Sequence, residues 1–291
     1  IDGRAMLREI RDMGFEYAEL SHGIRLSLVP GILEAVDAGE IKICSLHNFC
    51  PLPIGLTHAS PNAFKFSALD PRERDSALRH TLKTLELAER VHASLVVLHM
   101  GEVDMKEYTG RLLEMAEGGQ RDTPKYQRLC AEVDERRELR KTQHIMLAYD
   151  VLHRIAEQAA ERKLQLGIEN REAIEEIPFE GDFPFFFREF NTEVVRYWHD
   201  TGHAQIKENL GFISHAMHLE SLAEYLAGFH IHDVGFPGHD HLPPGQGMID
   251  FAALKPFVKA EHLKVLELHP DTPSEDVLAG LAHIKSVWGD T

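Results

Sequence analysis

The chain has 291 residues, of which 47 are acidic and 31 are basic, so its formal charge at pH 7 is −16. Hydrophobic residues make up 43% and charged residues 27%, proportions typical of a globular protein with a sizeable core. Nucleic-acid-binding proteins gain much of their affinity from basic surfaces, so this balance disfavours a nucleic-acid partner. No stretch reaches the roughly 20 apolar residues of a membrane span, and no signal-peptide pattern opens the sequence. With only three cysteines, the sequence predicts a soluble cytoplasmic protein.

Amphipathic segments alternate with short apolar runs along the chain. The pattern predicts helices at residues 2–14, 31–40, 71–92, 142–163, 213–227, 250–262 and 274–288. It predicts strands at residues 17–21, 42–49, 94–101, 165–170, 194–200, 228–234 and 264–269. Residues 102–141 are highly charged and lack a strand pattern, which indicates a partly helical insertion.

Strands that alternate with helices predict right-handed βαβ units and a parallel sheet. No linker or shift in composition divides the chain, so we expect residues 1–291 to form a single α/β domain. A closed (β/α)₈ TIM barrel has eight strands, one more than the pattern shows. Because the sequence opens directly in a helical pattern, we expect the first strand upstream of it. A doubly wound sheet is the alternative, disfavoured because no GxGxxG turn follows an early strand.

The four later strands end in polar residues, namely Glu169, Asp200, His230 and Glu267. They are 31, 30 and 37 positions apart, close to one strand-helix unit each. In a TIM barrel these strand ends meet at one face of the molecule, where the active site lies. Carboxylates and imidazoles that follow apolar runs are costly to bury unless they are paired or bind a metal. An oxygen-rich set with one nitrogen suits Mn²⁺, Mg²⁺, Co²⁺ or Zn²⁺.

Four motifs of the second half are similar to a known family: IEN, HDTGH, FHIHD with DHLPPGQGMIDF, and LELHP. They resemble the xylose-isomerase-like barrel superfamily, which contains sugar isomerases, sugar epimerases and apurinic endonucleases. The resemblance covers nearly the whole chain and implies Glu169, Asp200, His230 and Glu267 as metal ligands. It implies His230 rather than His232, because the family's ligand lies three residues before an acidic position. We expect His232 to face away from the metal, since alternate strand positions face opposite sides.

The resemblance also implies roles for further residues. His203 matches a residue that contacts the substrate in the epimerases and binds a further metal in the endonucleases. Glu175 resembles an epimerase residue that supports the catalytic glutamate or the substrate, with Glu172 and Glu176 as competitors for that role. Asn170 and Arg171 are candidate contacts for substrate hydroxyl groups. His47, His99 and His241 match histidines that bind extra metals in the endonucleases, which have an aspartate where this chain has His239.

The implied reaction is an isomerisation or epimerisation of a sugar or related polyhydroxy carbonyl compound through a metal-stabilised cis-enediolate. Glu169 and Glu267 would remove and return the carbon-bound proton. Only Arg171, Lys106 and Lys207 could face a phosphate at this rim, which favours an unphosphorylated sugar or polyol. The alternatives are a multi-zinc phosphodiester hydrolase resembling the apurinic endonucleases, and a dehydratase of sugar-like acids. The family tendency also implies a homo-oligomer.

Residues 179–190, FEGDFPFFFREF, contain six phenylalanines. One hypothesis is a lid whose apolar side chains exclude water from the reaction. The other is a short helix that packs on the barrel or on a partner subunit. The sequence leaves both open.

Overall fold

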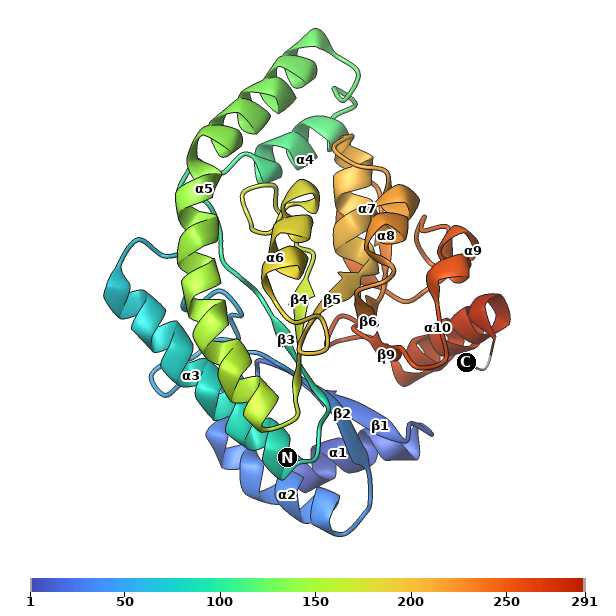
Figure 1. Cartoon of the computed structure of the whole chain (residues 1–291). Helices are drawn as coiled ribbons and strands as arrows, with labels where there is room; N and C mark the ends of the chain where they lie inside the picture. Colours follow the sequence, from blue (N-terminus) through green and yellow to red (C-terminus); the bar gives the residue numbers. More distant parts are fainter. Residues whose placement is uncertain (1, 290–291) are drawn as a thin grey trace. The chain divides into compact units, whose positions relative to one another are not determined.

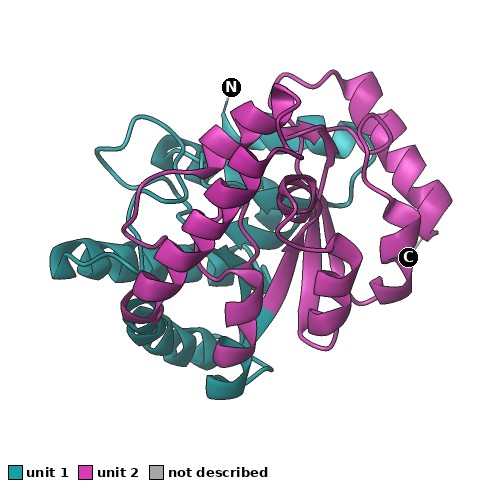
Figure 2. Ribbon diagram, turned by 90° about the horizontal axis from the view of Figure 1, so that it is seen from above, with its two compact units in different colours: residues 1–101, 146–168, 186–196 teal, residues 102–145, 169–185, 197–291 magenta. Residues whose placement is uncertain are grey.

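The computed structural model describes residues 2–289. The chain forms two compact units, shown in teal and magenta in Figure 2. The first unit consists of residues 1–101, 146–168 and 186–196, and the second of residues 102–145, 169–185 and 197–291. The expectation of a single domain over residues 1–291 stays a prediction.

The first unit begins with strands and helices in strict alternation (Figure 1). Its elements are α1 (Gly3–Asp12), β1 (Tyr17–Leu20), η1 (Leu26–Leu28), α2 (Val29–Asp37), β2 (Lys42–His47), α3 (Pro71–Arg90) and β3 (Leu95–Leu98). It also contains the later part of α5 (Pro124–Glu161), nearly all of β4 (Gln165–Glu169) and the start of β5 (Val195–Asp200).

Local sequence accounts for these elements. Helix α1 begins where the Asp2 side chain accepts a hydrogen bond from the Ala5 amide at 2.8 Å. Helix α3 begins in the same way, with the Asp70 side chain accepting a hydrogen bond from the Arg72 amide. Pro71 suits the first helical position because it has no amide hydrogen to leave unpaired. Strand β3 is buried throughout, as expected of a parallel strand whose two faces are both covered.

The second unit carries the carboxyl ends of β4 and β5, the later strands and most of the short helices. Its elements are α4 (Thr109–Glu117), η2 (Glu180–Asp182), α7 (Thr201–Leu210), α8 (His215–Leu222), β6 (Leu226–Ile231), β7 (Asp233–Gly235), β8 (His239–Leu242), α9 (Phe251–Leu254), η3 (Lys255–Phe257), β9 (Leu263–Leu266) and α10 (Ser274–Trp288). It also holds the first part of α5, the start of α6 (Phe183–Glu189) and the ends of β4 and β5.

The seven predicted strands form a sheet in the order β1-β2-β3-β4-β5-β6-β9. Strands β1 and β2, β2 and β3, β3 and β4, β5 and β6, and β6 and β9 pair in parallel, so the carboxyl ends of these neighbouring strands lie at the same edge. Asp200 of β5 lies opposite His230 of β6, and Ile231 lies opposite Leu266 of β9. The register therefore places Asp200, His230 and the start of the segment after β9 side by side. The eighth strand, expected upstream, stays a prediction.

Three helices differ from the sequence prediction. Helix α7 was not predicted, because nearly all of its residues are buried, polar ones included, and no amphipathic period remains. Helix α5 begins at Pro124 rather than at residue 142, so residues 102–141 contain α4 and the first part of a long helix. The helix predicted at 250–262 ends at Leu254 and gives way to a 3₁₀ turn, since Pro256 cannot donate the next hydrogen bond.

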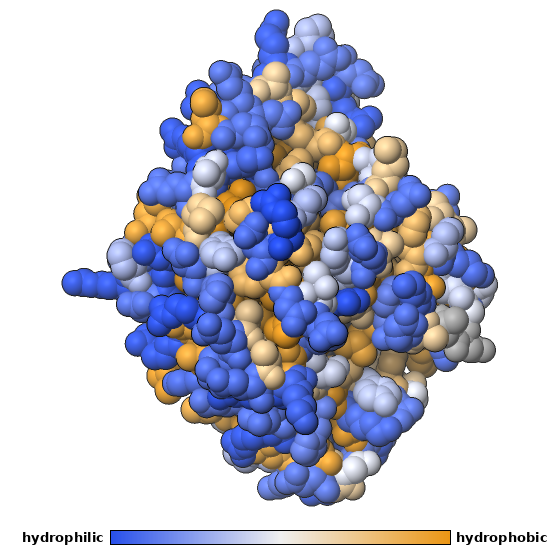
Figure 3. All heavy atoms as spheres, in the orientation of Figure 1, coloured by the Kyte–Doolittle hydropathy of each residue, from blue (hydrophilic) through white to orange (hydrophobic). Residues whose placement is uncertain are grey.

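The face drawn in Figure 3 is mainly hydrophilic, with apolar side chains in scattered groups. Such scattered exposure is ordinary for a folded chain. Within residues 2–289, none of the helices combines the length and the apolar composition that crossing a membrane requires.

Candidate metal centre

Four predicted ligands converge in the second unit. One ligand atom from each of Glu169, Asp200, His230 and Glu267 lies within 4.8 Å of the others. The Nδ1 atom of His230 is 2.6 Å from Glu169 Oε1, 3.0 Å from Glu267 Oε2 and 4.0 Å from Asp200 Oδ2. Three carboxylates therefore surround one imidazole nitrogen.

These four side chains differ in their access to solvent. Glu169, Asp200 and His230 are at most 1% exposed, whereas the Glu267 side chain is 27% exposed. Three carboxylates clustered around a single imidazole carry more negative charge than that group can balance, and burial makes the imbalance costly. A bound divalent cation would offset it, and three oxygen donors with one imidazole suit Mn²⁺, Mg²⁺, Co²⁺ or Zn²⁺. The donor set thus fits the predicted metal.

Arg171 supports this cluster from one side. Its Nη1 donates to Glu169 Oε2 at 2.6 Å, and its Nε donates to Glu176 Oε1 at 3.1 Å. Burial opposes the guanidinium charge, but Glu176 and Glu169 outweigh burial and raise the pKa of Arg171. Glu169 thus has one oxygen directed at His230 and the other at a permanent cation.

A second group of donors adjoins the first and shares Asp200 with it. Asp200, His203 and His232 also offer ligand atoms within 4.8 Å of one another. His232 Nε2 lies 3.0 Å from Asp200 Oδ1, and His203 Nδ1 lies 3.4 Å from Asp200 Oδ2. The expectation that His232 faces away from the site is wrong. Strand β6 ends at Ile231, so the alternation of strand side chains does not extend to His232.

The protonation of this second group follows from its surroundings. Burial outweighs the attraction of Asp200 and lowers the pKa of His203 to about 4, which leaves a neutral imidazole that can bind a metal. Burial also acts to lower the pKa of His232, but the charge and the hydrogen bond of Asp200 outweigh it, so the pKa of His232 is raised. Burial would favour a protonated Asp200, yet His203 and His232 outweigh it, so the pKa of Asp200 is lowered.

Strand β8 contributes two of its three polar residues to the site. Asp240 forms a third group with Glu172 and His203, again within 4.8 Å. The ring of His241 stacks on that of His232, with centroids 4.3 Å apart, and its Nδ1 is 3.0 Å from Asp240. His239 instead lies 3.3 Å from Glu117 of α4, and both side chains are largely exposed.

His47 and His99 belong to the first unit, at the ends of β2 and β3. The ring of His47 lies edge to face between His22, at 4.8 Å, and His99, at 4.7 Å. His47 Nδ1 is 3.0 Å from the Asn48 carbonyl oxygen, and His99 Nδ1 is 3.2 Å from Asn62 Oδ1. Their role as extra metal ligands stays a prediction.

Two of the predicted substrate contacts have other partners within the protein. The Glu175 carboxylate accepts hydrogen bonds from the Tyr108 and Thr109 amides and from the Thr109 hydroxyl, at the start of α4. Its neighbour Glu176, rather than Glu175, contacts Arg171. Asn170 is fully buried and binds the main chain of Asp200.

The phenylalanine-rich segment is packed rather than open. Phe183, Phe186 and Phe187 are 0–5% exposed. The Phe183 ring lies 5.1 Å from that of Tyr197, edge to face. Phe179 packs between two cations, with Arg137 at 4.9 Å and Lys207 at 5.3 Å from its ring. These contacts favour the hypothesis of a packed helix over that of a lid.

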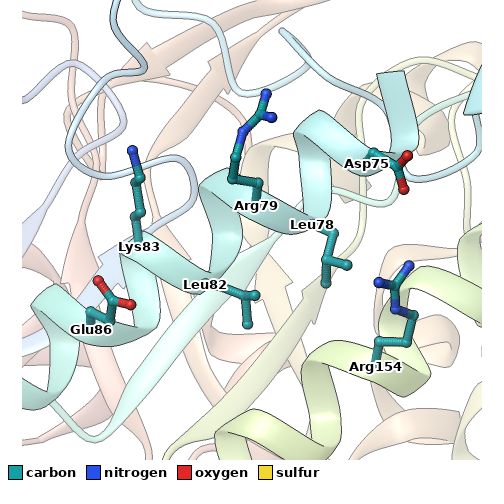
Figure 4. Close-up of a pocket in the computed structure, with 7 residues that line it drawn as sticks. All are labelled: Asp75, Leu78, Arg79, Leu82, Lys83, Glu86 and Arg154. Carbon is teal, nitrogen blue, oxygen red and sulfur yellow. The ribbon is translucent and has the colours of Figure 1, made fainter. Parts of the chain in front are cut away.

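A groove of about 420 Å³ in the first unit contains none of the candidate ligands (Figure 4). It lies along α3, with Arg154 of α5 on the other side, and its charged side chains have both signs. It offers neither a cluster of metal donors nor a buried polar group.

Comparisons with known proteins agree with this architecture. Residues 7–287 match the protein family described as xylose isomerase-like TIM barrel. A search of curated proteins gave no match. Similar solved structures include a D-tagatose 3-epimerase-like protein, at 15% identity over 99% of this chain and 95% of that one, with a TM-score of 0.69. A second is the apo form of 3-keto-D-glucoside 4-epimerase YcjR from E. coli, at 16% identity over 98% of this chain and 94% of that one, with a TM-score of 0.67. A third is D-psicose 3-epimerase from Clostridium cellulolyticum H10 with D-tagatose, at 12% identity over 99% of this chain and 94% of that one, with a TM-score of 0.68. At these identities the likeness shows a shared fold, and the predicted TIM-barrel class is confirmed.

Proposed function

Because the chain belongs to the xylose isomerase-like TIM barrel family, we propose that it is a divalent-metal-dependent isomerase or epimerase of a sugar or related polyhydroxy carbonyl compound. The observation that carries the proposal is the convergence of Glu169, Asp200 and Glu267 on the Nδ1 atom of His230. The sugar epimerases among the similar structures support the same class of reaction.

Glu169, Asp200, His230 and Glu267 would hold the metal, which when bound polarises a substrate hydroxyl and the adjacent carbonyl. A carbon-bound proton between these groups then becomes acidic enough for a carboxylate to remove. Glu169 and Glu267 flank His230 and can serve as the two proton carriers. Return of the proton to the neighbouring carbon gives an isomer, and return to the opposite face of the same carbon gives an epimer.

The two glutamates differ in their surroundings. Glu169 is buried and its Oε2 is bound by Arg171, so its carboxylate is held in one orientation. Glu267 is partly exposed, so a substrate would approach the site from its side. Either glutamate can act as the base, depending on the stereochemistry of the substrate.

The three basic residues that the sequence predicts at this rim are engaged within the protein, which supports an unphosphorylated substrate. Arg171 is bound to Glu169 and Glu176. Lys207 is buried against Glu180, and Lys106 lies over the ring of Tyr108 at 5.6 Å. A phosphate group would need one of these cations to leave its present partner.

The test is exchange of the substrate proton with solvent. The Mn²⁺-loaded protein is incubated with unphosphorylated ketohexoses such as D-tagatose and D-fructose in D₂O, and deuterium incorporation is followed by NMR. We expect Glu169→Gln and Glu267→Gln each to slow exchange by about 10²–10⁴-fold, the usual contribution of a general acid or base. Glu261→Gln, at an exposed position before β9, is the matched control and should exchange at the wild-type rate. Exchange that is equally fast in Glu267→Gln would overturn the proposal.

The two additional donor groups favour a second candidate, a multi-zinc phosphodiester hydrolase. Asp200 with His203 and His232, and Glu172 with His203 and Asp240, could hold further ions next to the first. The charge of −16 opposes a nucleic-acid substrate. Elemental analysis of protein purified without chelator separates the two functions. One ion per chain supports the isomerase. The hydrolase is supported by two or three zinc ions per chain that fall to one in His203→Ala, together with cleavage of a phosphodiester substrate.

A further inference from the structure

Asn170 makes a paired contact with the main chain of Asp200. Its Oδ1 accepts a hydrogen bond from the Asp200 amide at 2.7 Å, and its Nδ2 donates to the Asp200 carbonyl oxygen at 2.9 Å. The side-chain amide thus binds both polar groups of one peptide residue, as a neighbouring strand would. Asn170 follows directly after β4 and is 0% exposed.

This contact has only one arrangement of donors and acceptors. A main-chain N–H can only donate and a carbonyl oxygen can only accept, so the orientation of the Asn170 amide is determined by Asp200. An aspartate at position 170 could not donate to the carbonyl, and an alanine could make neither bond. Asp200 in turn ends β5 and caps α7, where its Oδ1 accepts from the His203 amide at 2.7 Å.

Tyr197 forms a further hydrogen bond to the side-chain amide of Asn170. Its hydroxyl donates to Asn170 Oδ1 at 3.1 Å and lies 2.7 Å from His199 Nδ1 and 2.8 Å from His218 Nε2. A hydroxyl has one hydrogen and two lone pairs. With its hydrogen on Asn170, it accepts from both imidazoles and is fully satisfied. Tyr197, His199 and His218 are buried, so the hydroxyl cannot exchange these partners for water.

We propose that Asn170 is a positioning residue for Asp200, and that Tyr197 keeps Asn170 in place. The inference rests on the proposed metal site, in which Asp200 is a ligand. The direction of the Asp200 carboxylate depends on the main-chain atoms that Asn170 binds. A rotation of this peptide would move both carboxylate oxygens relative to His230 and Glu169. Neither Asn170 nor Tyr197 needs to touch the metal or the substrate for this role.

The experiment measures Mn²⁺ affinity by the loss of the free-ion EPR signal on titration of the metal-free protein. Partners of metal ligands typically contribute 10–100-fold to affinity. We therefore expect Asn170→Ala to weaken Mn²⁺ binding by about 10–100-fold and Tyr197→Phe by about 3–10-fold. Tyr197→Phe keeps the ring and removes only the hydroxyl, so it tests the inference even where Asn170→Ala does not fold.

Phe183→Leu is the matched control, because Phe183 packs on the Tyr197 ring at 5.1 Å without joining its hydrogen bonds. It should lower the urea unfolding midpoint while leaving Mn²⁺ affinity within about 2-fold, well below the contribution of a partner that positions a ligand. Wild-type affinity in both Asn170→Ala and Tyr197→Phe, or an equal loss in all three variants, would overturn the inference. Failure of the wild-type protein itself to bind Mn²⁺, Zn²⁺, Co²⁺ or Mg²⁺ would instead overturn the proposed function.

Discussion

Replacement of Gly202 by alanine should disrupt the second donor group, although the same change strengthens most helices. Gly202 is the second residue of α7. A Cβ atom there would lie 1.9 Å from His232 Cε1 and 2.5 Å from His232 Nδ1. Ordinary contact begins at 3.4 Å, so the imidazole would have to move by roughly 1.5 Å, a displacement that a close-packed interior resists. Only glycine lets His232 lie against the first turn of α7.

The cost can be worked from the contacts that His232 would lose. Its Nε2 is 3.0 Å from Asp200 Oδ1, and its Nδ1 accepts from the His241 amide at 2.9 Å. A hydrogen bond to a charged group contributes about 1.5–3 kcal/mol, and overpacking costs about 1–3 kcal/mol. The higher helix propensity of alanine relative to glycine offsets about 1 kcal/mol of this cost. We expect Gly202→Ala to lower the free energy of unfolding by about 1.5–5 kcal/mol in net.

Urea unfolding followed by circular dichroism measures this change. Gly110→Ala is the matched control, because Gly110 is likewise the second residue of its helix, α4. A Cβ atom there meets only the end of the flexible Glu107 side chain, at 3.0 Å, so the control should stay within about 1 kcal/mol of the wild type. The reasoning is refuted if the two variants unfold at the same urea concentration.

Three further predictions concern the stability of the second unit. Lys207→Met should lower the free energy of unfolding by about 3–5 kcal/mol, because it leaves Glu180, whose side chain is only 10% exposed, without its cation. Urea unfolding checks this, and an unchanged midpoint would contradict it. Burial is the main cause that lowers the pKa of His215 to about 4, so unfolding, which restores a value near 6.5, is favoured as the pH falls from 6.5 towards 4. Between pH 7 and pH 4 the free energy of unfolding should therefore fall by about 3 kcal/mol less in His215→Gln than in the wild type. Urea unfolding at both pH values measures this, and parallel pH profiles of the two proteins would argue against it. Asp250→Ala should lower the free energy of unfolding by about 1 kcal/mol, because it removes the N-cap of α9. Asp271→Ala, at an exposed position, should leave it unchanged; equal effects of the two variants in thermal unfolding would exclude a contribution of the cap.

The strands were predictable because each one is a short apolar run that ends in a polar residue. All seven predicted strands lie in the observed sheet. The candidate ligands Glu169, Asp200, His230 and Glu267 could be proposed from the same pattern, since parallel strands bring their carboxyl ends to one edge. The elements that were missed lack such a signal. Helix α7 buries polar residues on all sides, and the β7–β8 hairpin follows β6 after a single residue.

The roles of individual polar residues depended on contacts that no local pattern reveals. Glu175 and Glu176 are adjacent in the sequence, yet one caps α4 and the other binds Arg171. The substrate contact expected of Asn170 stays a prediction, and only the structure shows that its side-chain amide binds the peptide of Asp200, 30 positions away. His232 was expected to point away from the site, because the end of β6 could not be located to one residue.

The sequence by itself determined which residue types are available at the strand ends, because strand periodicity is local and parallel pairing brings those ends together. Only the tertiary structure decided which donors share a carboxylate and which buried side chains hold them in place. The physical reason is that these choices depend on distances of a few ångströms between residues far apart in the chain. His232 reaches Asp200 only because Gly202 leaves room for its ring.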